Sequence, residues 1–161
     1  MIALGSNQPR SRRLTPRRLV EQAIGDFSRP PFRLIARSPI LETPPIGPSR
    51  RRYANAALLV EAPDHSPDAM LKRLKAMERA AGRRTRQRWG ARPLDLDIVL
   101  WSGGAWASPG LVIPHTAFRE RDFVLIPLSH IVPDWRDPIS GQTIAHLLAQ
   151  FKKPKKLSKS G

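Results

Sequence analysis

The sequence predicts an α+β fold in one domain, with helices packed on the faces of a mainly antiparallel sheet. Short apolar segments of strand character alternate with segments of helical spacing, and the chain contains no internal repeat. Several of the expected strands are close enough in sequence to pair antiparallel. The 161 residues can bury one sizeable core. We therefore expect one domain over residues 1–151 and a basic, disordered tail at 152–161.

In the first half of the chain, apolar runs predict strands and the helical spacing of apolar residues predicts helices. Proline is favoured in the first turn of a helix and glycine just after its end. The proline-rich segment 43–48 predicts a stiff loop. We expect strands at 2–4, 32–38 and 54–61, and helices at 18–27 and from Pro67 to a stop at Gly82.

The second half contains the clearest strand of the chain, at residues 94–101. A turn at Gly103 and Gly104 follows it. Residues 123–131 and 143–151 have the length and apolar content of short helices. Strands and helices are thus mixed along the chain, which is typical of an α+β layer sandwich.

The formal net charge of +15 is the strongest feature of the composition. Most of it comes from arginine, in clusters at 10–18, 50–52 and 83–92. Such a surface attracts polyanions, so nucleotide phosphates, nucleic acid and anionic membranes are candidate partners. For any single cluster, a solvated face is the simpler interpretation.

The chain contains no cysteine, which excludes disulfides, thiolate zinc sites and cysteine nucleophiles. No apolar run approaches the ~20 residues needed to cross a bilayer. The first residues do not resemble a signal peptide. These features predict a cytoplasmic protein without a membrane partner.

Two aspartates on one strand are the best candidates for chemistry. Alternate side chains of a strand point to opposite faces, so Asp95 and Asp97 project together while their apolar neighbours enter the core. Two adjacent carboxylates repel each other unless something positive lies between them. A hard divalent cation does this well, because magnesium takes carboxylate, phosphate and water oxygens. The simpler interpretation is a half-exposed strand with an acidic outer face.

The surroundings of the pair favour a phosphate site. Five arginines precede it in a chain that is otherwise short of acids, and the planar guanidinium grips phosphate oxygens in a bidentate way. The Gly-x-x-x-x-Gly-Lys loop, the dinucleotide-binding glycine pattern and the protein-kinase motifs are all missing. Any ATP site here therefore has a different architecture.

A series of motifs follows in a recognisable order. They begin with Leu4-Gly5-Ser6-Asn7, Thr43-Pro44-Pro45-Ile46-Gly47-Pro48 and Tyr53-x-Asn55, continue with Glu78, Gly82-Arg83 and Arg88-Trp89-Gly90-x-Arg92-Pro93-Leu94-Asp95-Leu96-Asp97-Ile98, and end with Ile113-Pro114-His115 and Arg121-x-Phe123. This set resembles the hydroxymethyl-dihydropterin pyrophosphokinase family of folate biosynthesis. The resemblance covers the chain to about Phe151, and its central block is the most specific part.

The resemblance implies a ferredoxin-like α+β fold and a magnesium-dependent diphosphotransferase. In that reaction the pterin hydroxymethyl oxygen attacks the β-phosphorus of ATP, pyrophosphate is transferred whole and AMP leaves. Two magnesium ions would bind at Asp95 and Asp97. The catalytic residues would be Arg83, Arg92, Asp95, Asp97, His115 and Arg121. ATP would be bound by Glu78, Arg83, Arg86, Trp89, Arg92, Ile98, His115 and Arg121. The pterin pocket would comprise Thr43, Pro44, Ile46, Tyr53, Asn55 and Phe123.

The chemistry of these side chains agrees with the implied roles. Tyr53 and Phe123 can stack on a flat heterocycle, and the amide of Asn55 can both donate to and accept from a pterin edge. His115 can support a phosphate oxygen through an N–H donor. The pterin hydroxyl could be activated by a metal-lowered pKa or by proton loss to one aspartate. We hypothesise that the loops 45–53 and 83–92 close over the substrates.

The chain departs from the family pattern at three positions that concern ATP. Relatives commonly carry a basic residue at Thr85, a basic residue at Gly110 and an aromatic at Thr116. A competing hypothesis is a nucleic-acid-binding protein, which the acidic pair and the scarcity of aromatics disfavour. Another is an inactive relative, which would be expected to lose a metal ligand. We expect a monomeric enzyme whose partners are ATP and the pterin.

Overall fold

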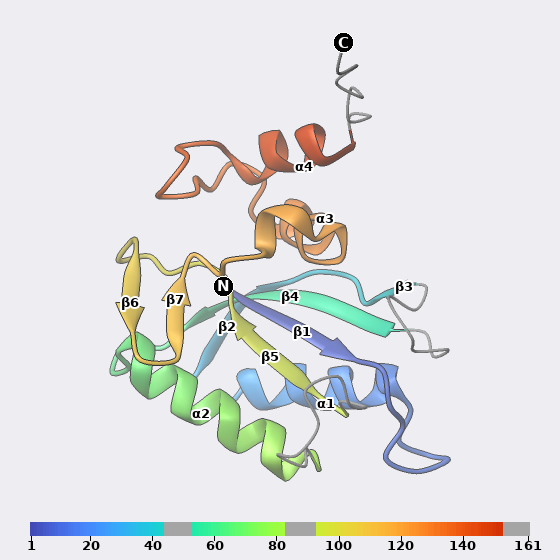
Figure 1. The fold of residues 1–161 in the computed structure, drawn as a ribbon. Helices are drawn as coiled ribbons and strands as arrows, with labels where there is room; N and C mark the ends of the chain where they lie inside the picture. Colours follow the sequence, from blue (N-terminus) through green and yellow to red (C-terminus); the bar gives the residue numbers. More distant parts are fainter. Residues whose placement is uncertain (44–52, 83–92, 153–161) are drawn as a thin grey trace.

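The computed structural model describes residues 1–43, 53–82 and 93–152. These residues form three layers: a five-stranded antiparallel sheet lies in the middle, and helices cover both of its faces (Figure 1). The prediction of an α+β fold with a mainly antiparallel sheet is confirmed. The expected loop at 43–48 lies mostly outside the described residues, as does the tail after residue 152.

Strand β1 (Ile2–Ser6) lies at the centre of the sheet. It pairs antiparallel with β4 (Tyr53–Glu61) on one side and with β5 (Asp95–Ile98) on the other. The opposite edge of β4 pairs with β2 (Arg33–Arg37) and β3 (Leu41–Thr43). The strand order is therefore β2-β4-β1-β5, with β3 also beside β4.

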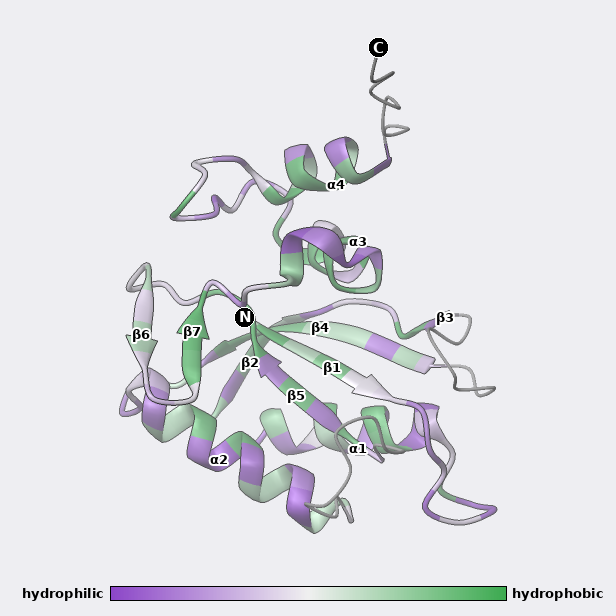
Figure 2. Ribbon diagram, in the orientation of Figure 1, coloured by the Kyte–Doolittle hydropathy of each residue, from purple (hydrophilic) through white to green (hydrophobic). Residues whose placement is uncertain are grey.

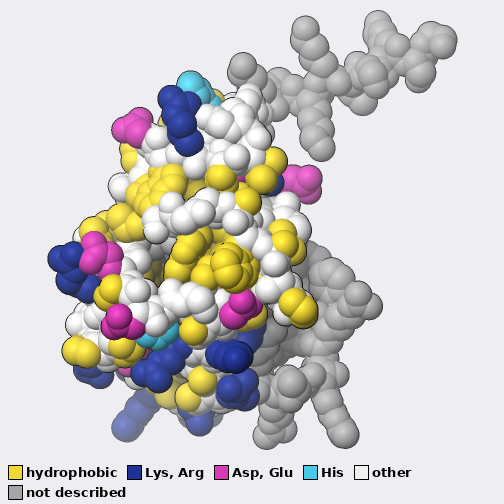
Figure 3. All heavy atoms as spheres, turned by 90° about the vertical axis from the view of Figure 1, so that its left-hand side faces the viewer, with side chains coloured by type: hydrophobic (Ala, Val, Ile, Leu, Met, Phe, Trp, Pro, Cys, Tyr) yellow, Lys and Arg dark blue, Asp and Glu magenta, His cyan; other side chains and the backbone are white. Residues whose placement is uncertain are grey.

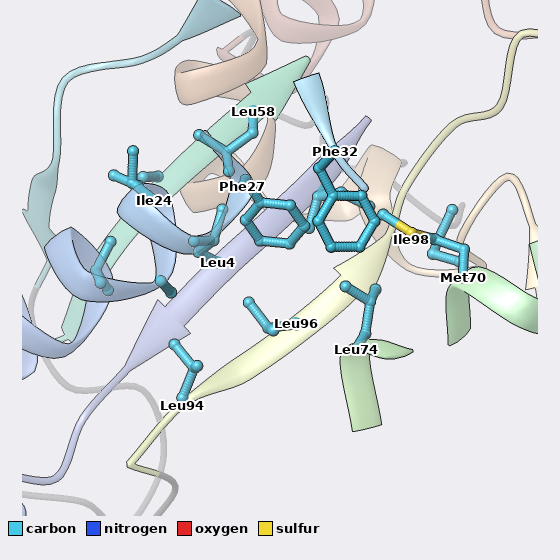
Figure 4. Packing of buried hydrophobic residues seen from close by; sticks show 14 of the residues in the cluster. Leu4, Ile24, Phe27, Phe32, Leu58, Met70, Leu74, Leu94, Leu96 and Ile98 are labelled. Atoms are coloured by element: carbon cyan, nitrogen blue, oxygen red, sulfur yellow. The ribbon is translucent and has the colours of Figure 1, made fainter. Parts of the chain in front are cut away.

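Helices α1 (Pro16–Phe27) and α2 (Pro67–Ala80) cover one face of the sheet. Each begins at a hydroxyl N-cap followed by proline, as Thr15 accepts from the Arg18 N–H and Ser66 from the Ala69 N–H. The apolar sides of both helices face the sheet (Figure 2). In the core between them, the rings of Phe27 and Phe32 lie 5.2 Å apart among leucines from α2 and the sheet (Figure 4).

Helices α3 (Asp122–Ile131) and α4 (Ile144–Lys152) lie on the other side of the sheet. A second core forms there around the fully buried Phe118, Leu125 and Leu128. A short 3₁₀ helix, η1 (Phe118–Glu120), precedes α3. A separate hairpin of β6 (Trp106–Ser108) and β7 (Leu111–Ile113) lies beside α2 in Figure 1. No helix among the described residues is both long enough and apolar enough to span a bilayer.

The structure differs from the sequence prediction mainly in its short elements. Strand β3 and the β6–β7 hairpin were not predicted, because strands of three residues are too short to show a periodicity. The strand expected at 94–101 ends as β5 at Ile98. Beyond that point the backbone of Val99 still makes hydrogen bonds on both sides, because its N–H donates to Met1 O and its carbonyl accepts from the His115 N–H.

An ion pair ties η1 to the loop between α3 and α4. The fully buried Asp137 carboxylate accepts from Arg119 Nε at 2.8 Å and from Arg119 Nη2 at 2.7 Å. It also accepts from the backbone N–H groups of Ile139 and Ser140 and from the Ser140 hydroxyl. Burial alone would raise the pKa of Asp137, but these hydrogen bonds lower it to about 2.

This ion pair predicts a pH-dependent contribution to stability. The folded pKa of Asp137 lies below its ordinary value of 3.8, so its stabilisation is present above that value and is lost as the pH falls toward 2. At pH 7, Asp137→Asn should lower the free energy of unfolding by about 3 kcal/mol. Urea unfolding at pH 7, 4 and 2.5 should show the difference from wild type shrinking in acid. A difference that stays constant would contradict this account, and the exposed Asp134→Asn serves as the control.

The core beneath β5 predicts a large cost for a cavity there. Leu96 is fully buried among side chains of α1 and α2. Leu96→Ala should lower the free energy of unfolding by about 3 kcal/mol, because lost transfer energy adds to an unfilled cavity. Ile35→Ala should cost much less, since Ile35 is 42% exposed on β2. Denaturant titration of the two variants measures the difference, and equal losses would contradict the assignment of Leu96 to the core.

Candidate active site

The candidate site lies on the face of the sheet that is turned toward α3. The register aligns Asn55, Gly5 and Asp95 in one row across β4, β1 and β5. The next row contains Ala57, Ala3 and Asp97. Residues directly opposite one another share a face. The floor between the amide and the two carboxylates is therefore made of three small residues, of which Gly5 and Ala3 are half-buried and Ala57 is fully buried in the core under α3.

The acidic pair occupies the predicted face of its strand. Asp95 and Asp97 are both half-buried, while Leu96 and Ile98 between and after them enter the core. Burial and the neighbouring Asp95 carboxylate raise the pKa of Asp97, whereas His115 and Lys75 act in the opposite direction. The site therefore favours positive charge near these oxygens.

His115 stands beside Asp97 in a defined tautomer. Its Nδ1 accepts from the Ala117 N–H at 3.2 Å, which places the ring proton on Nε2. That Nε2 lies 3.9 Å from Asp97 Oδ2. The backbone of His115 is held to the end of the β5 segment by its bond to Val99 O. His115 thus presents an N–H donor next to the acidic pair.

Glu78 lies behind β5 and is fully buried. Its Oε1 accepts from the Leu96 N–H at 2.9 Å and from Lys75 Nζ at 2.9 Å. Because Leu96 N–H points away from β1, Glu78 fixes the strand that carries both aspartates from its outer edge. Lys75 was not predicted as a site residue. Its spacing of three residues from Glu78 on one helix was the available signal.

A cavity of about 310 Å³ opens beside the acidic pair. Its walls come from α2, β5, the β6–β7 hairpin and the segment that follows β7. Its lining residues are Leu71, Lys75, Asp97, Ile98, Ser108, Gly110, Leu111, Val112, His115 and Thr116. Figure 3 views the side of the molecule that carries the β6–β7 hairpin and α2, where basic side chains gather in the lower part and hydrophobic ones in the middle. The cavity thus joins an apolar wall to a charged end.

Thr43 and Asn55 form a second group across the sheet from the acidic pair. Asn55 is 4% exposed, and its Nδ2 donates to Thr43 Oγ1 at 2.8 Å. Its Oδ1 is thereby turned toward Gly5, where a Cβ atom would lie 3.4 Å from it. Tyr53, paired with Thr43, is half-buried at the start of β4. The arrangement leaves Asn55 Oδ1 as an acceptor above the floor.

Arg121 and Phe123 meet at the start of α3, with the guanidinium carbon 5.7 Å from the ring centre. Ile98 is buried in the core and also lines the cavity. The other predicted site residues, Pro44, Ile46, Arg83, Arg86, Trp89 and Arg92, lie outside the described residues. Of the predicted residues, the structure brings Asp95, Asp97 and His115 together, and separately Thr43 with Asn55 and Arg121 with Phe123. Among residues 1–43, 53–82 and 93–152, no three His, Cys, Asp or Glu side chains form a group that could hold a metal.

Comparison with known proteins identifies close sequence relatives. A family model described as 7,8-dihydro-6-hydroxymethylpterin-pyrophosphokinase matches residues 1–133. Proteins named 2-amino-4-hydroxy-6-hydroxymethyldihydropteridine pyrophosphokinase are similar to this chain. That of Pseudomonas aeruginosa is 37% identical over 150 residues, which is 92% of this chain and 88% of the relative. That of Haemophilus influenzae is 36% identical over 152 residues, 93% and 91% of the two chains.

The relative from Synechocystis sp. is 39% identical over 104 residues. That match covers 65% of this chain and 53% of the relative, so it spans about half of the relative's length. The matches from Pseudomonas and Haemophilus therefore carry the comparison over nearly the full chain.

The hydrogen bond from the Leu96 N–H to Glu78 predicts that this side chain stabilises β5, and two substitutions can test it. Glu78→Ala should lower the free energy of unfolding by about 2 kcal/mol, because the buried Leu96 N–H loses its acceptor. Glu78→Gln keeps an oxygen at that position and should cost less. Thermal and urea unfolding of both variants without ligands measure the difference. Equal destabilisation by the two changes would show that the bond to Leu96 is unimportant.

Proposed function

The chain belongs to the 7,8-dihydro-6-hydroxymethylpterin-pyrophosphokinase family, and on this premise we propose that it transfers pyrophosphate from ATP to 6-hydroxymethyl-7,8-dihydropterin. The products are AMP and the pterin diphosphate, a step of folate biosynthesis. The single observation that carries the proposal is the pair Asp95 and Asp97 on one sheet face, beside His115 and an open cavity. We further propose a monomeric cytoplasmic enzyme with no macromolecular partner.

The proposal includes a ferredoxin-like arrangement of the sheet. Such a fold repeats a β-α-β unit and places the first strand between the third and the last of its main strands. With β3 as an extra short strand, the order β2-β4-β1-β5 and the helices α1 and α2 on one face support this assignment. Helices α3 and α4 are then additions on the opposite face.

Two magnesium ions are the proposed cofactor, held by Asp95 and Asp97. The donor set fits, because magnesium is usually bound by one or two carboxylates together with substrate phosphates and water. A site completed by phosphate oxygens also fits an acidic pair that has one histidine beside it and no third metal-ligating side chain in the described part of the chain. Bound there, the ions would neutralise the phosphate charge and align the reacting oxygen with the β-phosphorus. The half-buried setting strengthens these electrostatic interactions.

The cavity is the proposed ATP site. Its apolar wall of Leu71, Ile98 and Leu111 suits a flat base, while Lys75 and His115 suit phosphate oxygens. The exposed residues Gly110 and Thr116 line this cavity at positions where relatives commonly carry larger side chains. We propose that Glu78 contributes through β5 and Lys75. The predicted ATP contacts of Arg83, Arg86, Trp89 and Arg92 fall on residues outside the described ranges and stay predictions.

The pterin is proposed to lie over the small-residue floor. Asn55 Oδ1 would accept from a ring N–H, and Tyr53 and Phe123 would contact the ring faces, together with Pro44 and Ile46 from the preceding segment. The hydroxymethyl oxygen then attacks the β-phosphorus, the bond from that phosphorus to the α-phosphate oxygen breaks, and AMP leaves. His115 Nε2–H and Arg121 would donate to phosphate oxygens as charge shifts to AMP. The hydroxyl proton would pass either to solvent or to one aspartate, and a cation held by Asp95 and Asp97 would lower the pKa of the alcohol.

An AMP-formation assay tests this function directly. With magnesium, ATP and 6-hydroxymethyl-7,8-dihydropterin, the wild-type protein should form AMP and the pterin diphosphate in equal amounts. Asp95→Asn and Asp97→Asn should each lower the rate by roughly 1000-fold, because several kcal/mol of transition-state stabilisation are lost. Asp64→Asn, at an exposed turn before α2, is the matched control and should keep the wild-type rate. Neither site variant should have a lower unfolding midpoint than the wild type, because neither aspartate belongs to the core and burial together with Asp95 already disfavours the charged form of Asp97.

The outcomes separate the proposal from its alternatives. Wild-type protein that forms no AMP at any magnesium concentration would overturn the enzymatic assignment. Full activity in either aspartate variant would overturn the metal site while leaving the reaction itself in place.

A further inference from the structure

We propose that Gly5 determines specificity for the flat heterocycle, because the absence of a side chain there leaves the space in which the pterin ring lies on the sheet between Asn55 and Asp95. The inference rests on the proposed function and adds a residue that neither stacking nor metal binding accounts for. Glycine in a central strand lowers stability, because it loses more conformational freedom on folding than other residues do and has no side chain to pack.

The backbone at Gly5 does not require glycine. Among the described residues, glycines with positive φ are Gly82, Gly104, Gly110 and Gly141, and Gly5 is not one of them. Gly5 is paired on both sides, opposite Asn55 in β4 and Asp95 in β5. An alanine would therefore adopt the same extended conformation without strain.

The packing around Gly5 does not require glycine either. Among the described residues, the only atom within 4 Å of a Cβ atom at this position would be Asn55 Oδ1, at 3.4 Å, which is an ordinary contact distance. The sheet itself can thus accommodate a methyl group. As far as residues 1–43, 53–82 and 93–152 go, the remaining consequence of the glycine is space above the half-buried Gly5, on the face that carries Asn55 and Asp95. Strand glycines often mark a close approach of a ligand.

The neighbours of Gly5 indicate what fills this space. Asn55 Nδ2 is engaged by Thr43, so Asn55 offers its Oδ1 acceptor to a ligand group with an N–H. Strands are about 4.8 Å apart, which puts Asn55 and Asp95 about 10 Å apart across β1. Two fused six-membered rings with a one-carbon arm span a comparable length. In the adjacent row, Ala57 is fully buried in the core under α3 and Ala3 packs against that core, so the space lies over the row of Gly5.

A larger residue at position 5 would lift the ring from the sheet. It would weaken the bond to Asn55 and move the hydroxymethyl oxygen away from Asp95 and Asp97. The nucleotide cavity lies on the other side of the acidic pair, and Gly5 does not line it. The structure therefore assigns Gly5 to pterin recognition and not to ATP binding.

Gly5→Ala tests this assignment through three measurements. Its unfolding midpoint should equal or exceed that of the wild type. Its affinity for 6-hydroxymethylpterin, titrated calorimetrically with magnesium and an inert ATP analogue, should fall about tenfold or more, as an extra methyl group in a fitted pocket does. Its affinity for the ATP analogue alone should not change. Gly25→Ala is the matched control: it adds a methyl group in α1 with no atom within 4 Å and should leave pterin affinity unchanged.

Each result decides the question. Wild-type pterin affinity in Gly5→Ala would overturn the inference. A large loss of stability in this variant would also overturn it, because packing within the sheet would then explain the glycine. An equal loss of affinity for the ATP analogue would replace pterin specificity with a general distortion of the site. If the wild-type protein itself binds no pterin, it is the proposed function that fails.

Discussion

The pairing of β1 with both β4 and β5 is the constraint on which the site depends. Because β1 is hydrogen-bonded on both sides, one register fixes where three strands present their side chains. A shift by one residue would send Asp95 and Asp97 into the core and expose Leu96. The apolar residues between the aspartates oppose such a shift, since they fill the core under α1 and α2. Core packing on one face thus secures the chemistry on the other.

The charges around the acidic pair follow from the same geometry. Asp97 is flanked by a second carboxylate and by burial, both of which disfavour its charged form. His115 and Lys75 partly offset this, and they come from separate segments that reach β5 from different directions. Glu78 holds the strand and Lys75 at once. The described residues around Asp97 therefore favour positive charge near its carboxylate, which suits a centre completed by its substrates.

The sequence predicted the large elements and the acidic face, because both depend on local periodicity. A few consecutive residues show the alternation of polar and apolar side chains in β5. The same is true of the N-caps and apolar faces of α1 and α2. The presence of Lys75 in the cavity wall and the inferred role of Gly5 could not be predicted from such patterns. Lys75 lines the cavity because α2 packs against the outer edge of β5. The inferred role of Gly5 arises because β4 and β5 bring Asn55 and Asp95 to either side of it. The β6–β7 hairpin and β3 escaped prediction because they are too short. Placement of the arginine-rich segment 83–92 rests on its resemblance to relatives and not on the described geometry.

The bond from the Leu96 N–H to Glu78 has a further consequence for how the molecule behaves in a crowded solution. Strand β5 is the last strand of its sheet, and terminal strands offer unpaired backbone groups to which the strands of other molecules can add. Here a buried carboxylate already occupies a donor on that edge, and α2 stands in front of it. The strand that bears both aspartates is thereby shielded from intermolecular sheet extension. The interaction that holds the acidic pair in position also acts against aggregation.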